Sequence, residues 1–350
     1  MSASLDQTPA SLAALWAGLR DAEPKLRIRD AAQRLGVSEA ALVETLPGAL
    51  RLRNDWSALL HGLTELGPVM ALTRNESVVH ERRGTYLDVK AEGQVGLVLG
   101  PDIDLRLFFA HWKFAWFVPA DLPGASKGAI QVFDAAGTAV HKIFATDATP
   151  EGALEALARR LADPAPAPAA FEAVAPRKPG KPDAEIDAEA LRDGWAGLKD
   201  THEFFPLLRK SGAGRLQALR LAGEEWARRL PVDAASRVFT AAAETGTPIM
   251  VFVNNPGCIQ IHTGPIHRVA VMGPWFNILD PDFDLHLNTG TIGQAWLVTK
   301  PTSDGDVTSV EIFDTEGELV MMLFGARKPG QQEDLGWRAL AWKTAEVEAA

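Results

Sequence analysis

The sequence repeats itself at a constant spacing across its two halves. The segment PVM at Pro68 returns as PIM at Pro248, and PDIDL at Pro101 returns as PDFDL at Pro281. The same spacing of 180 positions relates further pairs, among them Asp102 and Asp282, Asp104 and Asp284, Trp116 and Trp296, Phe133 and Phe313, and Gly137 and Gly317. Because an unchanged spacing over such a span rarely arises by chance, we infer that one structural unit has been duplicated.

Each half begins with helical patterning and continues as short strands. The segments LWAGLRD around Trp16 and GWAGLKD around Trp195 lead into stretches whose apolar residues recur every three or four positions. Beyond Pro68 and Pro248 the chain breaks into β-branched or aromatic runs separated by Gly, Pro, Asn and Asp; in the second half these are IMVFV, CIQIHTG, RVAVMG, FDLHL, AWLVTK, TSVEIFD and LVMMLFG. Strands do not alternate with helices, so we predict an α+β fold in which each half places helices before a large antiparallel sheet.

A segment rich in Pro and Ala, residues 163–185, separates the halves. Its composition and weak periodicity are typical of a semi-rigid tether. We therefore predict an N-terminal domain at residues 1–162, this linker, and a C-terminal domain at residues 186–350.

Composition excludes several classes of function. A formal net charge of -10 and a pI near 5.4 disfavour a nucleic-acid partner. The N-terminal residues lack the features of a signal peptide, and no stretch reaches the roughly 18 apolar residues of a membrane span, so we expect a cytoplasmic protein that is not membrane-embedded. The single cysteine, Cys258, excludes an internal disulfide and a thiolate cluster, and any metal must be bound by histidine or carboxylate.

Positions that differ between the halves are better functional candidates than positions that both share. Three such differences are Arg106 against His286, Lys300 against Ala120 and, at a spacing of 179, His202 against Glu23. They predict one composite site rather than two equal ones.

His202 is the candidate metal ligand. It follows Asp200 and Thr201, which can cap a helix, so its ring is expected to project from a first helical turn. The alternative interpretation is a surface or capping histidine. The other histidines form no close pair at helical spacing, and we interpret most of them as strand-surface or loop residues, with the role of His80 left open; they are His61, His80, His111, His141, His262, His267 and His286.

Four cationic side chains form a second set of candidates. Arg106 alternates with Leu105 and Leu107, which should face the core, so it either points into a cleft or lies exposed on a sheet. Arg215, Lys300 and Arg327 are either solvated charges or a group that holds a dianionic ligand. The aromatic side chains Phe108, Phe252 and Phe324 fit a core as well as a ligand platform.

Long segments of both halves carry a family resemblance. They include DTHEFFPLLRK, PIMVFVNNPGCIQIHTGPI, NILDPDFDLHL and WLVTKPTSDGDVTSVEIFD in the second half, and ALTRNESVVHERRGTY, DIDLRLFFAHW and IQVFDAAGTAVHKIF in the first. In these segments the chain resembles the HemS/ChuS/HmuS/PhuS family of haemin-degrading and haemin-transport proteins of bacterial haem-uptake systems. The resemblance covers essentially the whole chain, including its duplication.

The resemblance implies that haem b, iron protoporphyrin IX, binds in a cleft between the halves. His202 corresponds to the iron ligand, and Arg106 to an arginine on the opposite face of the ring. Arg215 and Lys300 correspond to residues that hold the propionates, with Arg327 nearby, while Phe108 and Phe252 correspond to residues that line the macrocycle. Phe324, in LFGAR, replaces a tyrosine of some members and removes one hydroxyl group.

Two functions agree with this resemblance. The first is an oxygenase of iron acquisition that opens the macrocycle and releases iron, with Arg106 as the catalytic residue. The second is a carrier that takes haem from an inner-membrane ABC importer and passes it to a separate haem oxygenase. Without the resemblance, a tandem interaction module that binds no cofactor remains a third interpretation.

Overall fold

The chain divides into two compact units. The computed structural model describes residues 9–120, 125–174, 180–328 and 330–345. Unit 1 consists of residues 1–73, 81–175 and 255–260, and unit 2 of residues 74–80, 176–254 and 261–350. Strands β3 (Val78–Gly84) and β12 (Cys258–Gly264) therefore each pass from one unit into the other. Residues 1–8, on which part of the expectation about a signal peptide rests, lie outside the described residues.

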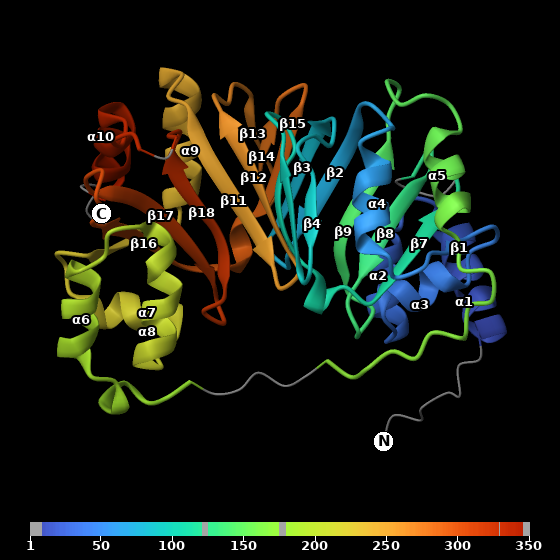
Figure 1. Cartoon of the computed structure of the whole chain (residues 1–350), viewed down its shortest axis with the longest axis horizontal. Coiled ribbons are helices and arrows are strands. Elements are labelled where there is room, and N and C mark those ends of the chain that lie inside the picture. The colour runs from blue at the N-terminus through green and yellow to red at the C-terminus, as the bar shows by residue number, and fades with distance from the viewer. Residues whose placement is uncertain (1–8, 121–124, 175–179, 329, 346–350) are drawn as a thin grey trace. The chain divides into compact units, whose positions relative to one another are not determined.

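Unit 1 is built around an antiparallel sheet with helices on both faces (Figure 1). Its main run of strands is β1-β7-β8-β9-β2, and a second run is β6-β5-β4. The strands are β1 (Leu50–Arg51), β2 (Val69–Arg74), β4 (Lys90–Glu92), β5 (Val95–Leu99), β6 (Asp104–Phe108), β7 (Phe114–Val118), β8 (Ala129–Phe133) and β9 (Ala139–Ala145). The helices are α1 (Pro9–Ala22), α2 (Ile28–Leu35), α3 (Glu39–Glu44), α4 (Trp56–Leu63), η1 (Phe109–His111) and α5 (Ala153–Leu161).

Unit 1 has two hydrophobic cores, one on each face of its main run of strands, because successive side chains of a strand point to opposite faces. Phe114 and Trp116 of β7 pack with α1–α3, whereas Ala115 and Phe117 of the same strand pack with α4 and α5.

Unit 2 follows the same plan. Its main run is β10-β16-β17-β18-β11, and its second run is β15-β14-β13. The strands are β10 (Ala227–Leu230), β11 (Ile249–Asn255), β13 (Val269–Met272), β14 (Trp275–Leu279), β15 (Phe283–Asn288), β16 (Ile292–Lys300), β17 (Val307–Asp314) and β18 (Leu319–Gly325). The helices are η2 (Asp183–Glu185), α6 (Ala188–Ala196), η3 (Thr201–Glu203), α7 (Phe204–Ser211), α8 (Arg215–Ala222), α9 (Ala234–Thr245), η4 (Thr289–Thr291) and α10 (Leu335–Ala345).

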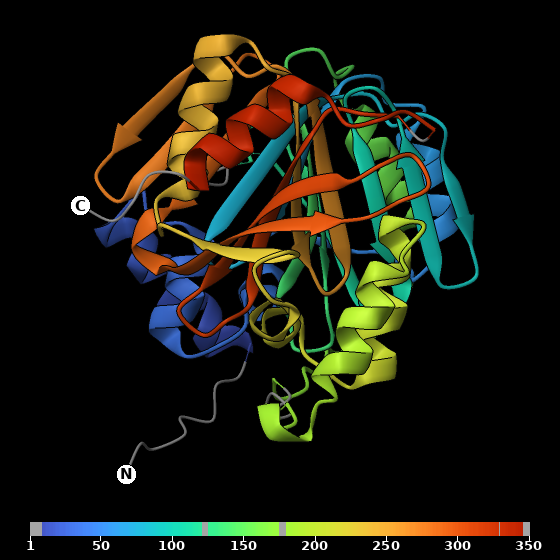
Figure 2. The ribbon, with the colours of Figure 1, turned by 90° about the vertical axis from the view of Figure 1, so that its left-hand side faces the viewer.

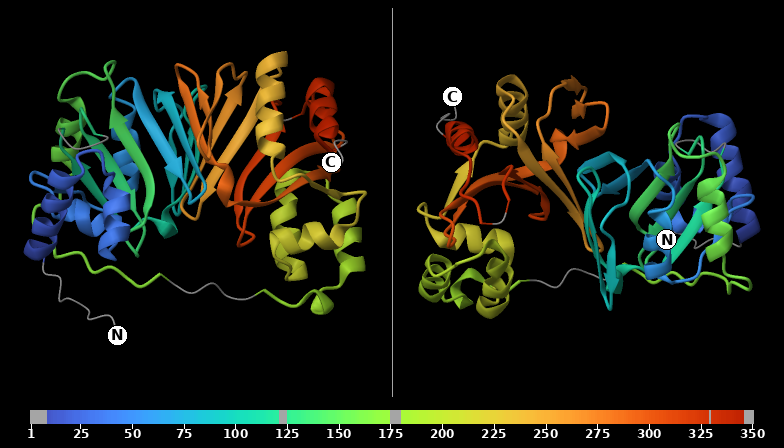
Figure 3. Two further views of the ribbon diagram at one scale, coloured as in Figure 1. Left: turned by 180° about the vertical axis from the view of Figure 1, so that it is seen from behind. Right: turned by 45° about the horizontal axis from the view of Figure 1, so that its top comes forward.

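Two helical layers cover opposite faces of the main run in unit 2. Helices α9 and α10 pack on Leu297 and Val310, and helices α6–α8 pack on Trp296 and Phe313. Figure 2 shows α9 and α10, in gold and red, separated by the strands from the yellow-green α6–α8, and both views of Figure 3 show the same separation.

The strand register confirms the duplication. In unit 1, Gln131 of β8 pairs with Lys142 of β9, and in unit 2 Glu311 of β17 pairs with Met322 of β18. Both pairs of strands also have a register shift at the same place, between Val132 and Phe133 of β8 and between Ile312 and Phe313 of β17. The predicted α+β fold, with helices and antiparallel sheet in each copy, is therefore confirmed.

The expected order of helices before strands is incomplete. Each main run begins with a short strand, β1 or β10, and each copy ends with a helix, α5 or α10. Among the described residues, no helix is long and apolar enough to cross a lipid bilayer.

Both described ends of the linker pack on the unit to which they belong. Phe171 lies edge-on to Phe114 at 5.3 Å between ring centroids, and the backbone N–H of Glu172 donates to the carbonyl of Ala135 at 2.9 Å. At the other end, Gln217 of α8 donates from Nε2 to the carbonyl of Lys181 at 2.8 Å. The linker therefore contributes packing to both units in addition to joining them.

The interpretation of most histidines as strand-surface or loop residues was wrong for His141 and His262, whereas the role of His80 was left open. His80, His141 and His262 are buried, and the ring of His262 stacks on Phe283 with centroids 3.9 Å apart. Strand alternation places these imidazoles on the covered side of a sheet, where a ring can pack like an aromatic residue.

His141 lies in a buried chain of polar side chains in unit 1. Its Nε2 lies 2.6 Å from the Tyr86 hydroxyl, and its Nδ1 lies 3.0 Å from Thr73 Oγ1. Thr73 Oγ1 also lies 3.2 Å from Cys258 Sγ. Burial raises the pKa of the Cys258 thiol to about 12 and lowers the pKa of His141 from 6.5 to about 3. All members are therefore neutral at physiological pH.

This neutral histidine predicts a specific loss of stability in acid. An unfolded chain binds a proton at His141 below pH 6.5, whereas folded unit 1 binds it only near pH 3. The free energy of unfolding should therefore fall as the pH drops from 6.5 toward 3, by about 1.4 kcal/mol per pH unit from this side chain.

We expect His141→Gln to reduce the slope of unfolding free energy against pH by about that amount, as measured by urea unfolding between roughly pH 4 and pH 6. The same substitution at the exposed His111 is the matched control and should leave the slope unchanged. Identical slopes for the parent and His141→Gln would contradict the prediction.

Candidate functional site

His202 lies in a short 3₁₀ turn whose backbone is fixed by hydrogen bonds on both sides. The Asp200 side chain accepts a hydrogen bond from the backbone N–H of His202 at 2.7 Å. The Glu203 side chain accepts from the backbone N–H groups of Lys199 and Asp200 at 2.7 and 3.2 Å, which completes a capping box. The expectation that Asp200 caps this helical segment is confirmed.

The side chain of His202 is oriented by the same carboxylate. Asp200 Oδ1 lies 2.6 Å from His202 Nδ1. Hydrogen bonds from the backbone and then the ring of His202 lower the pKa of Asp200, so the carboxylate is ionised at neutral pH and can only accept. In the neutral imidazole, Nδ1 therefore carries the proton and Nε2 the lone pair. The side chain is 93% exposed, so Nε2 is open to a metal in the arrangement by which carboxylates orient metal-binding histidines.

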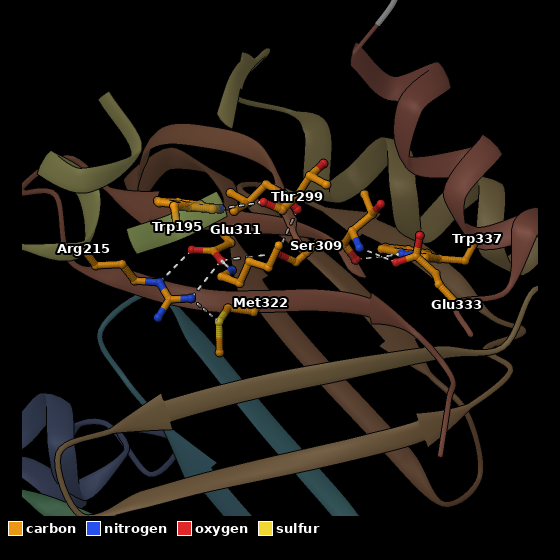
Figure 4. Close-up of polar contacts among 11 residues, drawn as sticks. Trp195, Arg215, Thr299, Ser309, Glu311, Met322, Glu333 and Trp337 are labelled. Atoms are coloured by element: carbon orange, nitrogen blue, oxygen red, sulfur yellow. Dashed lines mark hydrogen bonds and ion pairs between the residues drawn. The ribbon is translucent and has the colours of Figure 1, made fainter. Parts of the chain in front are cut away.

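Two cations of unit 2 meet at the carboxylate of Glu311 on β17. Arg215, the first residue of α8, donates from Nε and Nη2 to the two carboxylate oxygens at 2.7 and 2.8 Å (Figure 4). Lys300, the last residue of β16, donates from Nζ to Glu311 Oε1 at 2.9 Å. We name these three residues the cation cluster; with two positive charges and one negative charge, its formal net charge is +1.

Burial differs within the cation cluster. Glu311 is fully buried and Lys300 is 3% exposed, whereas the side chain of Arg215 is 24% exposed. Burial alone would raise the pKa of Glu311, but the charges of Arg215 and Lys300 hold it far below its usual value. Burial lowers the pKa of Lys300, and Glu311 opposes that shift by stabilising the ammonium. The buried carboxylate thus stabilises the ammonium form of a buried lysine next to a partly exposed arginine.

Phe204 connects the His202 turn to the cation cluster. It is the first residue of α7, and Trp195 packs edge-on against it with ring centroids 4.6 Å apart. Lys300 Nζ lies 4.6 Å, and Arg215 Cζ 5.2 Å, from the centroid of its ring. Cation–π contacts of this kind favour a charge over an aromatic face. The candidate iron ligand and the candidate anion site are therefore attached to the same helix start.

An aromatic surface lies beside the cation cluster. Phe252 of β11 and Phe324 of β18 meet edge-to-face at 5.2 Å, and both are partly exposed. Met322 pairs with Phe252 in the sheet, and its Sδ lies 3.1 Å from Arg215 Nη2. Unit 2 thus places a partly exposed apolar surface next to a guanidinium group.

Arg327 lies on the same side of unit 2 as the His202 turn. Its charge contributes to the lowered pKa of Asp200, and its Nη1 donates to the carbonyl of Gln331 at 3.2 Å.

Arg106 and Phe108 belong to unit 1 and share one face of β6. Leu105 and Leu107 are fully buried on the opposite face, as the alternation predicted. Arg106 forms an ion pair with Asp104 and remains partly exposed. The predicted site residues therefore form two groups, these two in unit 1 and the remaining six in unit 2, namely His202, Arg215, Phe252, Lys300, Phe324 and Arg327.

Sequence reasoning missed Glu311, Met322 and Phe204. Glu311 had a detectable signal, because it is the only charged residue within the otherwise uncharged run VTSVEIF. A carboxylate in the middle of a fully buried strand needs a cationic partner. Met322 and Phe204 had no such signal, since both types are ordinary in a core.

A protein-family model, the haemin-degrading HemS/ChuX domain, matches the chain twice, at residues 36–161 and 212–343. The chain belongs to the HemS/ChuX family. A curated HemS-family relative, the hemin transport protein HmuS of Yersinia pestis, is 36% identical over 335 residues, which cover 94% of this chain and 96% of HmuS. The hemin transport protein HemS of Yersinia enterocolitica is 37% identical over 322 residues, 89% of this chain and 90% of HemS.

Solved structures of the HemS family share the fold over nearly the whole chain. Holo-PhuS, a heme-binding protein from Pseudomonas aeruginosa, superposes with a TM-score of 0.93 at 52% identity, covering 96% of this chain and 98% of PhuS. ChuS, described as an E. coli heme oxygenase, superposes with a TM-score of 0.85 at 34% identity, covering 95% of this chain and 99% of ChuS.

The double role of Asp200 predicts two separable effects of Asp200→Ala. Loss of the cap should lower the free energy of unfolding by about 1 kcal/mol, measured by urea unfolding. Loss of the carboxylate should also remove the preference of the neutral His202 ring for a proton on Nδ1. This change should be visible in the ¹⁵N chemical shifts of the ring.

Asp187 is the matched control, because it caps α6 by accepting from the backbone N–H of Ala190 at 2.9 Å. Asp187→Ala should cost similar stability and leave the His202 ring signals in place. Unchanged ring signals in Asp200→Ala would show that the carboxylate does not set the tautomer.

Proposed function

We propose that this protein binds haem b, iron protoporphyrin IX, with His202 as the iron ligand. One observation carries the proposal. Unit 2 combines an exposed imidazole whose Nε2 lone pair is free, a cluster of net positive charge, and a partly exposed aromatic surface beside that cluster. Haem requires the same three chemistries, because it presents an iron, two carboxylates and a flat apolar ring.

Each candidate residue takes one part of this ligand. Arg215, with Lys300 behind it and Arg327 nearby, would hold the carboxylates through charge-assisted hydrogen bonds. Phe252, Phe324 and, from unit 1, Phe108 would contact the ring. Arg106 would supply positive charge to the face of the ring that His202 does not use.

We further propose that the protein degrades haem in the cytoplasm by oxidative ring opening, which releases iron for the cell. ChuS, described as a heme oxygenase, supports this assignment. When bound, haem supplies the redox chemistry, and the chain's own residues bind it, orient it and place the charge of Arg106.

The second candidate is a carrier that receives haem from an inner-membrane importer and passes it to a separate oxygenase. The names of the hemin transport proteins HmuS and HemS support it. Phe324 favours it as well, because a phenyl ring offers no hydroxyl hydrogen bond where some relatives carry a tyrosine.

A haemin titration tests binding. Adding haemin to the purified protein should shift the Soret band at one equivalent, and His202→Ala should weaken binding by at least about tenfold because the axial bond is lost. His267→Ala, at another exposed histidine of unit 2, is the matched control and should bind as the parent does. Absence of a Soret shift in the parent would reject both haem functions.

Turnover distinguishes degradation from transport. The haem-loaded protein, given a reductant and oxygen in the presence of catalase, should lose its Soret band and release iron. Arg106→Ala should slow that loss by about tenfold or more while leaving haemin affinity within about threefold. A Soret band that persists in the parent would assign the protein to transport. Equal loss of binding and bleaching in Arg106→Ala would show a structural arginine.

A further inference from the structure

The two units carry different charges at corresponding places. In unit 1, Glu39 is the first residue of α3, and its carboxylate forms an ion pair with Lys142 of β9. Gln131, the register partner of Lys142, is neutral. The charged side chains of this trio therefore cancel.

In unit 2, Arg215 takes the place of the helix-start carboxylate, Glu311 that of the neutral glutamine, and Met322 that of the strand lysine. Lys300 then adds a second cation that unit 1 lacks, because Ala120 stands at the matching position. Duplication has thus produced a neutral trio in unit 1 and a cluster of net charge +1 in unit 2.

Within the cation cluster, only Arg215 is placed to meet a ligand. Its hydrogen bonds among the described residues use Nε and Nη2, which leaves Nη1 with donors to spare. Lys300 is almost completely buried below it, and Glu311 is fully buried. A carboxylate arriving from solvent would therefore contact the guanidinium group first.

We propose that Glu311 is a positioning residue that fixes the Arg215 guanidinium for a ligand carboxylate and holds the Lys300 ammonium group beside it. The inference rests on the proposed function, in which the ligand is an iron porphyrin dicarboxylate. Glu311 itself does not reach the ligand. Its two oxygens hold one edge of the guanidinium fork and so set the direction in which Nη1 points.

Neutralising Glu311 should disturb the position of the Arg215 guanidinium more than it changes the net charge of the cation cluster. Without the carboxylate, Lys300 would be an unpaired ammonium in a dry site and would give up its proton, so the cluster would stay near +1. Arg215 would keep its charge but lose the carboxylate that fixes the orientation of its guanidinium plane. A fall in affinity for a carboxylate ligand would then report the lost geometry.

The test compares Glu311→Gln with the parent using two probes, haemin and haemin dimethyl ester, which has the same ring and iron but no free carboxylates. The parent should bind haemin at least about tenfold more tightly than the ester, a difference typical of one charge-assisted contact. Glu311→Gln should lose most of that preference by weakening haemin binding, while ester binding stays within about threefold. A purely structural defect would weaken both probes equally.

Glu333→Gln is the matched control. Glu333 is another buried carboxylate of unit 2, accepting from the backbone N–H of Thr308 and from Arg338 Nε, and it contacts neither Arg215 nor Lys300 (Figure 4). This variant should lose stability but keep the preference for haemin over the ester.

If Glu311→Gln does not fold, the double variant Glu311→Gln with Lys300→Met provides the same test, because replacing a buried ion pair by uncharged side chains is usually tolerated. An unchanged haemin preference, or tighter haemin binding, in the folded variant would overturn the proposal for Glu311 and leave the proposed function intact. Failure of the parent to bind haemin would instead reject the proposed function.

Discussion

Complete burial of the central strands is the constraint on which both units depend. Every residue of β8 and all but the last residue of β17 are buried, so each of these strands requires cover on both faces. Each unit provides it with three helices on one face and two on the other. Any charge that such a strand carries must be neutralised inside the protein, because water does not reach it.

This constraint explains where the functional asymmetry could arise. The corresponding strand positions Gln131 and Glu311 are polar in both copies. In unit 1 the register partner of Gln131 pairs with the first residue of α3, whereas in unit 2 Glu311 itself pairs with the first residue of α8. In unit 1 the polar residue is neutral. In unit 2 it is a carboxylate that pairs with two cations, one of them buried and one partly exposed. This difference at one strand position accompanies a positively charged surface in unit 2.

The sequence predicted most of the fold because periodicity and repetition are local signals. The strand segments from IMVFV to LVMMLFG and the repeated spacing at Pro68 and Pro248 are found as strands and duplicated units. The short strands β1 and β10 escaped prediction, since two to four residues carry too little pattern. His141 and His262 were misjudged, because burial of an imidazole depends on which face of a strand is covered, and sequence alone does not show this.

The site was predicted less completely. His202 with its Asp200 cap could be recognised from neighbouring residues, and the cations from comparison of the two halves. Glu311, 96 residues after Arg215 in the chain, could not be linked to it without the folded sheet.

The open Nε2 of His202 also has a kinetic consequence. In the proposed function, the iron ligand is already oriented by Asp200 and its side chain is 93% exposed, so His202 would need no side-chain rearrangement before it meets haem.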